Sequence, residues 1–331
     1  MARLIHTLAA LAVLGLAAGC ADGPGAGRAP GTGGASQRTE AGARSPFWVD
    51  PAGPAARQIE VWRRQGRTAD AALLRRIADR PVALWPAGED PGPAVRAATA
   101  AAAREGRTAL FVAYDIPHRD CGQHSAGGAP DADAYRRWIG RFADALGDGR
   151  ALVVLEPDAV AHMVDGCTPA EYHEERERLL AEAVVRLKHR PRTTVYLDAG
   201  NPSWIPDSER LVGPLERAGV AHADGFSLNV SNFQTDAASR QYGLGLSGRL
   251  GGKHFVVDTS RNGNGPLEGV WCNPPGRALG TPPTTATGEP LLDAYLWIKR
   301  PGESDGECGG GPAAGRWWPE YALELTRGSA R

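Results

Sequence analysis

Apolar and β-branched residues occur in short runs from about residue 80 onwards, and longer stretches with helical spacing lie between the runs. One run, Leu152-Val153-Val154-Leu155, contains no polar residue. Runs of this kind are typical of strands that are covered on both faces, as in a parallel sheet. The pattern predicts seven strands, at 82–85, 108–114, 151–156, 193–197, 225–229, 254–258 and 294–299.

Helical spacing is clearest at 132–146. The apolar residues there recur every three or four positions and so share one helix face; they are Tyr135, Trp138, Ile139, Phe142 and Leu146. Gly147 follows, where a helix is expected to end. A second helix is predicted from Pro169 to about Lys188. Strands that alternate with helices predict a parallel α/β sheet, either open or closed into a barrel.

Charged, amide and tyrosine side chains stand where the predicted strands end. They include Tyr114 and Asp115, Glu156 and Asp158, Asp198 and Asn201, Asn229 and Asn232, Asp258 and Asn262, and Lys299, Glu303 and Asp305. A single Asp at such a place could cap a helix. Six successive strand ends of this kind are better explained by an active site, which a β/α barrel builds at the carboxyl ends of its strands.

The first twenty residues predict export. Arg3 and His6 precede an apolar stretch at 8–18, which Gly19 and Cys20 close. The stretch is too short to span a bilayer and resembles a secretory signal. Residues 16–20 also resemble a bacterial lipobox, in which Cys20 becomes the lipidated N-terminus. We therefore expect a protein that is lipid-anchored at the outer face of the cell membrane, with a plain signal and secretion as the alternative.

Residues 21–46 are rich in Gly, Ala and Pro and predict a flexible tether. The catalytic domain is expected at 47–331. The chain has five Cys, and an odd number in an exported protein leaves one to explain. If Cys20 carries lipid, two disulfides can form among the other four, and spacing alone permits three pairings of Cys121, Cys167, Cys272 and Cys308.

Composition and motifs exclude several classes of function. The formal net charge is −1 and Lys and Arg form no dense run, so we expect no nucleic-acid partner. Neither a zinc-binding HExxH motif nor a GxSxG elbow occurs, and we expect no metal and no other cofactor. Carboxylates beside exposed aromatic residues fit cleavage of a glycosidic bond. One carboxylic acid protonates the leaving oxygen and a second carboxylate handles water.

Six motifs, in chain order, resemble glycoside hydrolase family 6, the inverting endoglucanases and cellobiohydrolases. They are YDIPHRDC at 114–121, LEPD at 155–158, LDAG at 197–200, DTSRNG at 258–263, EGVWCNP at 268–274 and WIKRPGESDG at 297–306. The resemblance covers the chain from about Phe47 to the C-terminus. It implies a distorted parallel (β/α) barrel with about seven strands.

The resemblance also implies roles for individual residues. Asp158 matches the catalytic acid, and Asp120 matches the aspartate that holds the proton of this acid and helps to relay the proton of water. Asp305 matches the disputed candidate for the base. Tyr114 matches the tyrosine that distorts the sugar ring at the cleavage point. Inversion implies that the product is the α-anomer.

Substrate contacts are implied in the same way. Asp198 matches a substrate-site carboxylate, and Ser125 lies in the mobile loop that the family closes over substrate. Other sugar-binding positions are Trp85, Trp204, Trp271, Lys299 and Glu303, and we add the strand-end residue Asn229. Relatives usually carry His where this chain has Asn201, which can bind a sugar hydroxyl but carries no charge. The family pairs Cys121 with Cys167, and Cys272 with Cys308.

The loops at the carboxyl face are short. From Asp305 to Trp317 the chain runs twelve residues without an insertion. Short loops predict an open groove, and hence an endo-acting hydrolase of β-1,4-glucosidic bonds in cellulose-like or mixed-linkage β-glucan. We also expect a monomer. Two alternatives are a catalytically inactive, lipid-anchored glucan-binding protein and a barrel hydrolase of another polysaccharide. Contact with a membrane is expected only through the lipid at Cys20.

Overall fold

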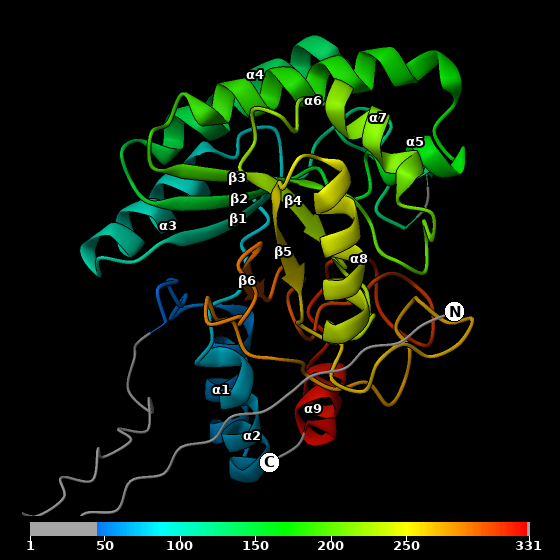
Figure 1. Cartoon of the computed structure of the whole chain (residues 1–331). Helices are drawn as coiled ribbons and strands as arrows, with labels where there is room; N and C mark the ends of the chain where they lie inside the picture. Colours follow the sequence, from blue (N-terminus) through cyan, green and yellow to red (C-terminus); the bar gives the residue numbers. More distant parts are fainter. Residues whose placement is uncertain (1–44, 123, 330–331) are drawn as a thin grey trace, which may run out of the picture. The chain divides into compact units, whose positions relative to one another are not determined.

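Six parallel strands form one sheet in chain order, which is the core of the fold (Figure 1). The computed structural model describes residues 45–122 and 124–329. The predicted signal peptide, the lipidation site at Cys20 and nearly all of the predicted tether lie outside these residues. The strands are β1 (Ala109–Ala113), β2 (Ala151–Leu155), β3 (Thr193–Asp198), β4 (Gly225–Leu228), β5 (His254–Asp258) and β6 (Leu292–Leu296).

Helices connect successive strands up to β5, because parallel neighbours need a crossover. They are α4 (Ala132–Leu146), α5 (Ala161–Asp165), α6 (His173–Lys188), α7 (Glu209–Arg217) and α8 (Asp236–Arg249), with the short 3₁₀ turns Asp120–Gly122 and Ala170–Tyr172. Helix α3 (Gly92–Arg104) precedes β1, and a long loop, residues 259–291, joins β5 to β6. The predicted helix at 132–146 is confirmed as α4, whose first turn is capped by Asp131.

Alternate residues of each strand point to opposite sides of the sheet. One set packs under the helices, for example Phe111 and Val153. The other set, including Val112, Val154 and Leu296, fills the inner side of the curled sheet. Helices α4 and α6 lie side by side over the outer side (Figure 1). The parallel α/β architecture predicted from the sequence is confirmed.

The strand count differs from the prediction in one place. The predicted first strand, 82–85, is not a full strand, although its backbone still joins the two edges of the sheet. Ala83 N donates to Trp297 O at 2.9 Å, just beyond β6, while Leu84 N donates to Leu110 O of β1 at 3.0 Å. Pro81 and Pro86 flank the segment, and proline offers no N–H for a longer ladder. Six strands and this bridging segment therefore take the place of seven strands.

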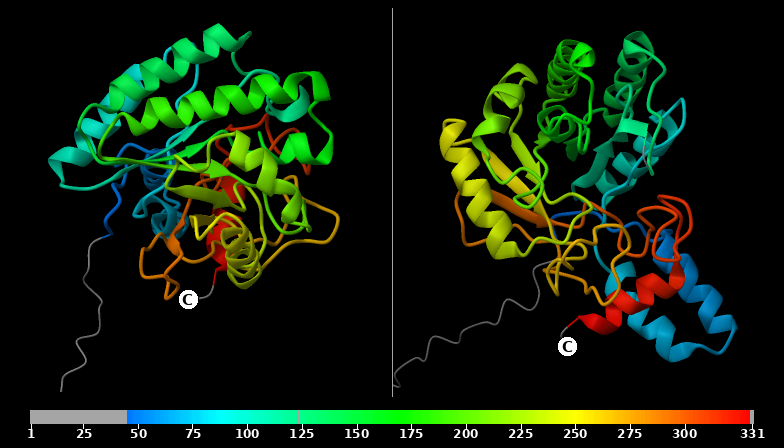
Figure 2. Two further views of the ribbon diagram at one scale, coloured as in Figure 1. Left: turned by 45° about the horizontal axis from the view of Figure 1, so that its top comes forward. Right: turned by 90° about the vertical axis from the view of Figure 1, so that its right-hand side faces the viewer.

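A second group of helices lies apart from α4 and α6: α1 (Pro54–Arg64), α2 (Thr68–Ala78) and α9 (Pro319–Gly328). The right-hand view of Figure 2 shows these helices gathered together. Trp62, Leu74, Trp297 and Leu325 form their shared core. This core anchors the segment after β6, which carries the last of the predicted site residues. Within the described residues, no helix is both long and apolar enough to cross a membrane.

Candidate active site

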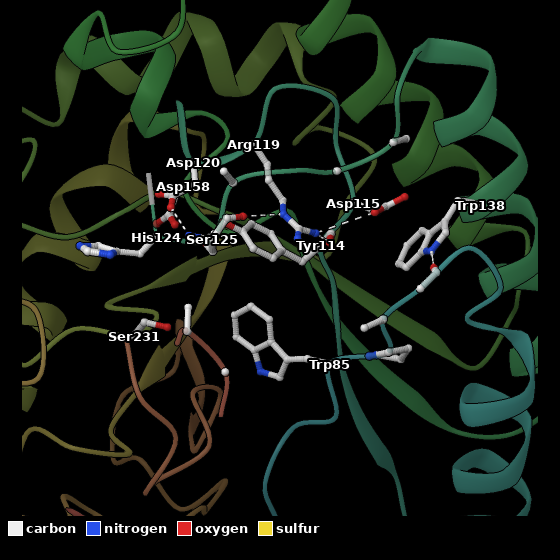
Figure 3. Close-up of a pocket in the computed structure, with 18 of the residues that line it drawn as sticks. Trp85, Tyr114, Asp115, Arg119, Asp120, His124, Ser125, Trp138, Asp158 and Ser231 are labelled. Atoms are coloured by element: carbon white, nitrogen blue, oxygen red, sulfur yellow. Dashed lines mark hydrogen bonds and ion pairs between the residues drawn. The ribbon is translucent and has the colours of Figure 1, made fainter. Parts of the chain in front are cut away.

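A cavity of about 980 Å³ opens at the carboxyl ends of the strands. It gathers most of the residues predicted to act on substrate: Trp85, Tyr114, Asp120, Ser125, Asp158, Trp271, Lys299, Glu303 and Asp305. Several of them face one another across the cavity in Figure 3. They come from the segment before β1, from the loops after β1 and β2, and from the loops on either side of β6.

Asp158 follows β2 and is partly exposed in the cavity. Its backbone has a φ of 72°, a conformation that few non-glycine residues adopt. Burial raises the pKa of Asp158 well above its usual value, and the neighbouring carboxylates of Asp198 and Asp120 raise it further. The side chain therefore keeps its proton at pH values where an ordinary aspartate is ionised.

Asp198 lies beneath Asp158 and is not exposed to the cavity. Its side chain is 1% exposed. Oδ2 accepts the backbone N–H groups of Asp158 (2.9 Å) and Gly200 (3.1 Å), and Oδ1 accepts the hydroxyl of Ser227 (3.0 Å). Burial raises the pKa of Asp198 to about 6. In this structure the carboxylate of Asp198 holds the backbone of Asp158 and does not line the cavity.

Asp120 is tied to the loop that follows it. Its Oδ2 accepts the backbone N–H of Ser125 at 2.6 Å, and the hydroxyl of Ser125 lies 3.0 Å from that of Tyr114. Arg119 supports both, since it donates to the carbonyl oxygens of Ser125 (2.8 Å) and Tyr114 (2.7 Å), and its guanidinium lies over the Tyr114 ring. The motif around Asp120 thus forms one hydrogen-bonded unit over the ring of Tyr114 (Figure 3).

Asp305 has the opposite electrostatic surroundings. Arg261 Nη1 lies 2.9 Å from Oδ2, Lys299 Nζ lies 3.2 Å from Oδ1, and the backbone N–H of Asn273 also donates to Oδ2. Burial alone would raise the pKa of Asp305, but the charges of Arg261 and Lys299 outweigh it and lower this pKa below its usual value. Asp305 is therefore a fixed anion.

Aromatic rings line the cavity on both sides of these acids. Trp85 meets the edge of Tyr114 with ring centroids 5.5 Å apart, and its indole N–H donates to Ile298 O. Trp271 is 50% exposed and lies 5.6 Å from the ring of His124. Partly exposed rings of this kind can stack on sugars. The loop of Asp120 thus contacts the loop of Trp271 through the ring of His124.

Three other predicted sugar-binding residues do not line the cavity. Asn201 is 3% exposed, and its Oδ1 accepts the backbone N–H groups of Ser203 and Trp204. Asn229 is fully buried and donates to Asp258 O. Trp204 donates from its indole to Asp165 Oδ2 at 2.7 Å. In this structure these side chains hold the loops around the acid and do not line the cavity.

Sequence reasoning missed His162, which is buried one helical turn after Asp158. The four-residue spacing after a strand-end acid was the available signal. Arg261 was also missed, although it lies inside the DTSRNG motif and holds Asp305. All but one of the described non-glycine residues with positive φ follow strand ends, and Asn273 lies beside Asp305, as expected where strain is kept for function. They are His118, Asp120, Cys121, Glu156, Asp158, Asn229, Ser231 and Asn273.

Two disulfides brace the cavity. Cys121 is bonded to Cys167 and Cys272 to Cys308, the pairing that the resemblance implies. The first ties the residue after Asp120 to the segment that follows α5. The second ties the loop of Trp271 to that of Asp305. The first bond therefore braces the loop of Asp120, and the second joins two loops that carry candidate site residues.

One group of side chains has the spacing of a metal site. Carboxylate oxygens of Asp120 and Asp158 and a ring nitrogen of His162 lie within 4.8 Å of one another. Cys121, His162 and Cys167 are equally close, but the two cysteines are disulfide-bonded and offer no thiolate. A metal would need Asp158 to lose its proton, which the raised pKa of this residue opposes.

Comparison with known proteins agrees with the motifs. Residues 42–329 match the profile of the family described as "Glycosyl hydrolases family 6". The chain is 44% identical to endoglucanase A of Cellulomonas fimi over 287 residues, covering 86% of this chain and 61% of that protein. It is 43% identical to endoglucanase 1 of Streptomyces halstedii, covering 85% of this chain and 88% of that protein.

A solved structure is also similar. It is that of the endoglucanase Cel6 from Mycobacterium tuberculosis, in complex with methyl-cellobiosyl-4-deoxy-4-thio-β-D-cellobioside. The TM-score is 0.79 at 44% identity, and the match covers 86% of this chain and 98% of that chain.

Proposed function

Because the chain belongs to family 6 of the glycosyl hydrolases, we propose that it is an endo-acting, inverting glucanase that cleaves β-1,4-glucosidic bonds in cellulose-like or mixed-linkage glucans. The chain spans about three fifths of the Cellulomonas fimi relative, so the proposal is argued from its own residues. The observation that carries it is the raised pKa of Asp158 in a cavity that also holds Trp85 and Trp271.

Asp158 is the proposed general acid. Its proton goes to the leaving glycosidic oxygen while the bond from that oxygen to the anomeric carbon breaks. The oxygen of a water bonds to the same carbon from the opposite face of the ring, so the configuration inverts. Tyr114 lies close to the acid. Burial raises the pKa of the Tyr114 hydroxyl, and the charge of Asp158 raises it further. A sugar ring pressed against the Tyr114 side chain would be distorted from its relaxed chair conformation.

Asp120 is the better candidate than Asp305 for receiving the proton of the water. A carboxylate with a low pKa accepts a proton poorly, and both oxygens of Asp305 already bind cations. Within the described residues, Oδ1 of Asp120 has no hydrogen-bond partner, whereas Oδ2 is held by Ser125. We assign to Asp305 the stabilisation of the positive charge that develops on the sugar ring.

Release of reducing sugar from carboxymethylcellulose, mixed-linkage β-glucan and lichenan tests the activity. Binding without release would instead favour the inactive glucan-binding protein, and release from another polysaccharide alone would favour a different substrate. Proton NMR of the earliest product should show the α-anomer. A β-anomer would mean retention and would contradict the assigned mechanism.

The endo mode rests on the short loop between Asp305 and Trp317 and on the exposure of Trp271. An open groove admits the middle of a polymer and releases it after one cut. The viscosity of soluble glucan should then fall quickly while reducing ends rise slowly. If cellobiose accumulates from the start with viscosity nearly unchanged, attack from chain ends is the better description.

Location is proposed separately from activity. Two disulfides fit an oxidising, extracellular compartment, and the sequence around Cys20 fits a lipid anchor. A radiolabelled fatty acid should mark the wild-type protein and not Cys20→Ser. Complete release of unmodified wild-type protein into the medium would favour the plain signal instead.

A further inference from the structure

Arg176 is a buried cation without an acidic partner. It lies in the first turn of α6, and the residue is only 3% exposed. Among the residues that the structure describes, no carboxylate forms an ion pair with it, and burial lowers the pKa of its guanidinium. A buried charge is costly unless hydrogen bonds compensate it. The hydrogen bonds of Arg176 therefore identify the groups that it holds.

The two terminal nitrogens of Arg176 make four hydrogen bonds. Nη2 donates to Pro117 O at 3.0 Å and to His118 O at 2.9 Å. Nη1 donates to Thr168 Oγ1 at 2.7 Å and to Ala159 O at 3.3 Å. Each of these nitrogens carries two hydrogens, so every terminal N–H of the guanidinium has an acceptor.

Three of these acceptors belong to the two turns that carry the acids of the proposed mechanism. His118 precedes Asp120 by two residues, and Ala159 directly follows Asp158. The backbone φ is 56° at His118, 53° at Asp120 and 72° at Asp158. Non-glycine residues keep such values only where the surrounding structure holds them. Arg176 thus joins two strained turns.

Other restraints act at the two ends of the turn of Asp120. Glu156 accepts the backbone N–H groups of Asp115 and Ile116 before it, and the first disulfide holds Cys121 after it. Arg176 binds the carbonyl groups that lie between these two points. It therefore restrains the middle of this turn and connects it to the residue after Asp158.

We propose that Arg176 is a positioning residue, which keeps the carboxyl groups of Asp120 and Asp158 close together. Their oxygens lie within 4.8 Å of one another. The inference rests on the proposed function, in which Asp158 donates a proton to the leaving oxygen and Asp120 receives one from water. At this distance the ionised Asp120 favours the protonated form of Asp158, so separation of the two turns would slow the chemical step.

Arg176→Lys tests this connection and keeps the positive charge. Lysine has a single nitrogen and cannot bind both turns as the two terminal nitrogens of the guanidinium do. We expect kcat on mixed-linkage β-glucan to fall about tenfold or more. KM should change little, because Arg176 contacts neither Trp85 nor Trp271. Arg176→Gln is the second variant, which keeps the test valid if the lysine variant fails to fold.

Lys188→Met is the matched control, at the other end of the same helix. Lys188 Nζ donates to Thr193 O at 3.0 Å and lies 2.8 Å from Asp224 Oδ2, at the amino end of β3. Its loss should lower the thermal unfolding midpoint and leave kcat nearly unchanged, since these contacts lie at the edge of the sheet opposite to the acids. If the Arg176 variants also lose only stability and keep kcat at temperatures where they are folded, the role is purely structural and the proposal is overturned.

A second readout does not need activity. NMR of ¹³C-labelled aspartate carboxyl carbons follows the titration of Asp158, which is assigned as the signal absent from Asp158→Asn. Besides burial and Asp198, the carboxylate of Asp120 raises the pKa of Asp158, so Asp120→Asn should lower this pKa. We expect the decrease to be smaller when Asp120→Asn is combined with Arg176→Lys than when it is made in the wild type.

Other influences on the pKa of Asp158 cancel in this comparison. They are burial, the charges of Asp198, Lys299 and Asp165, and the nearby ring of His162. All of them are present with and without Asp120→Asn, so the decrease measures the interaction between Asp120 and Asp158. Equal decreases in both backgrounds would overturn the inference. A wild type that is inactive on every β-glucan but shows the smaller decrease with Arg176→Lys would contradict only the proposed function.

Discussion

At the scale of single residues, the site holds two carboxyl groups whose surroundings act in opposite directions. Asp158 has burial and two carboxylates around it, which raise its pKa. Asp305 is also buried, but Arg261 and Lys299 contact its oxygens and lower its pKa. Neighbouring acids separated in this way can act as proton donor and as fixed anion at the same pH.

Replacing the acid tests this difference. Asp158→Asn keeps the shape but offers no acidic proton, so hydrolysis of unactivated glucan should fall by about 10²–10⁴-fold. Binding of a cello-oligosaccharide, measured by calorimetry, should change little. Asp148→Asn, an exposed aspartate outside the cavity, is the control and should be fully active. Activity of Asp158→Asn within a few-fold of wild type would exclude it as the acid.

Single-residue chemistry was predictable from the sequence only in part. The strand-end pattern and the motifs placed Asp120, Asp158 and Asp305 in one cavity correctly. They could not show that Asp198 is beneath the surface, because a strand end reveals which edge a residue reaches and not its depth. The position of His162 was missed since it depends on a helical turn after the strand and on contact with a disulfide.

At the scale of elements, buried carboxylates at strand ends organise the loops. After β5, Asp258 accepts backbone N–H groups from Ser231, Ser260, Ile298 and Lys299. After β2 and β3, Glu156 and Asp198 bind backbone groups in the same manner, and each of the three is at most 1% exposed. Loops that carry the chemistry are thus attached to neighbouring strands by charge-assisted hydrogen bonds.

The loop of Asp120 also depends on a glycine. Gly306 packs against the ring of His124, and a Cβ on Gly306 would lie 2.5 Å from Cγ of that ring. Gly306→Ala should therefore displace the loop, and with it Ser125 and Asp120, which share a hydrogen bond. We expect kcat to fall about tenfold or more, as misplacement of catalytic groups usually causes.

The double variant Gly306→Ala/His124→Ala is the control for this prediction. Removing the imidazole relieves the two contacts at 2.5 Å and leaves only the Cβ of residue 124, at 2.9 Å, so part of the lost kcat should return relative to Gly306→Ala. Equal kcat values for the single and double variants would show that the clash with His124 is not the cause. Gly315→Ala, at a position where a Cβ has open space but φ is 74°, separates loop strain from the specific contact.

The boundaries of strands and helices were predicted best where the pattern of apolar residues is continuous or strictly periodic. The strand at 151–156 and the helix at 132–146 have continuous or strictly periodic apolar residues, and both are found within a residue or so. Segment 82–85 has a similar apolar pattern, but Pro81 and Pro86 limit its hydrogen bonding to a bridge between sheet edges. Pairing of this kind depends on partners far away in the chain, which local patterns do not reveal.

At the scale of the whole molecule, the carboxyl face is held together by carboxyl groups that the fold has buried. Burial raises the pKa of Glu156 from 4.5 to about 7 and that of Asp198 from 3.8 to about 6. The folded chain consequently binds more protons than the unfolded chain between these values. By linkage, such groups stabilise the fold fully below their unfolded pKa and lose this contribution as pH rises through the folded pKa.

The free energy of unfolding should therefore fall as pH rises from about 4.5 to 7. Glu156 alone accounts for about 3 kcal/mol, the equivalent of the difference between its two pKa values. His162, whose pKa is lowered, makes the free energy of unfolding rise with pH over part of this range, but it is one group against several buried acids.

Urea unfolding at several pH values measures how the free energy of unfolding depends on pH. Glu156→Gln should flatten it, even though Gln lowers overall stability by placing an NH₂ group near the N–H groups that Glu156 accepts from Asp115 and Ile116. The exposed substitution Glu171→Gln should leave the wild-type dependence in place, and equal slopes for wild type and Glu156→Gln would show that this carboxyl is ionised throughout.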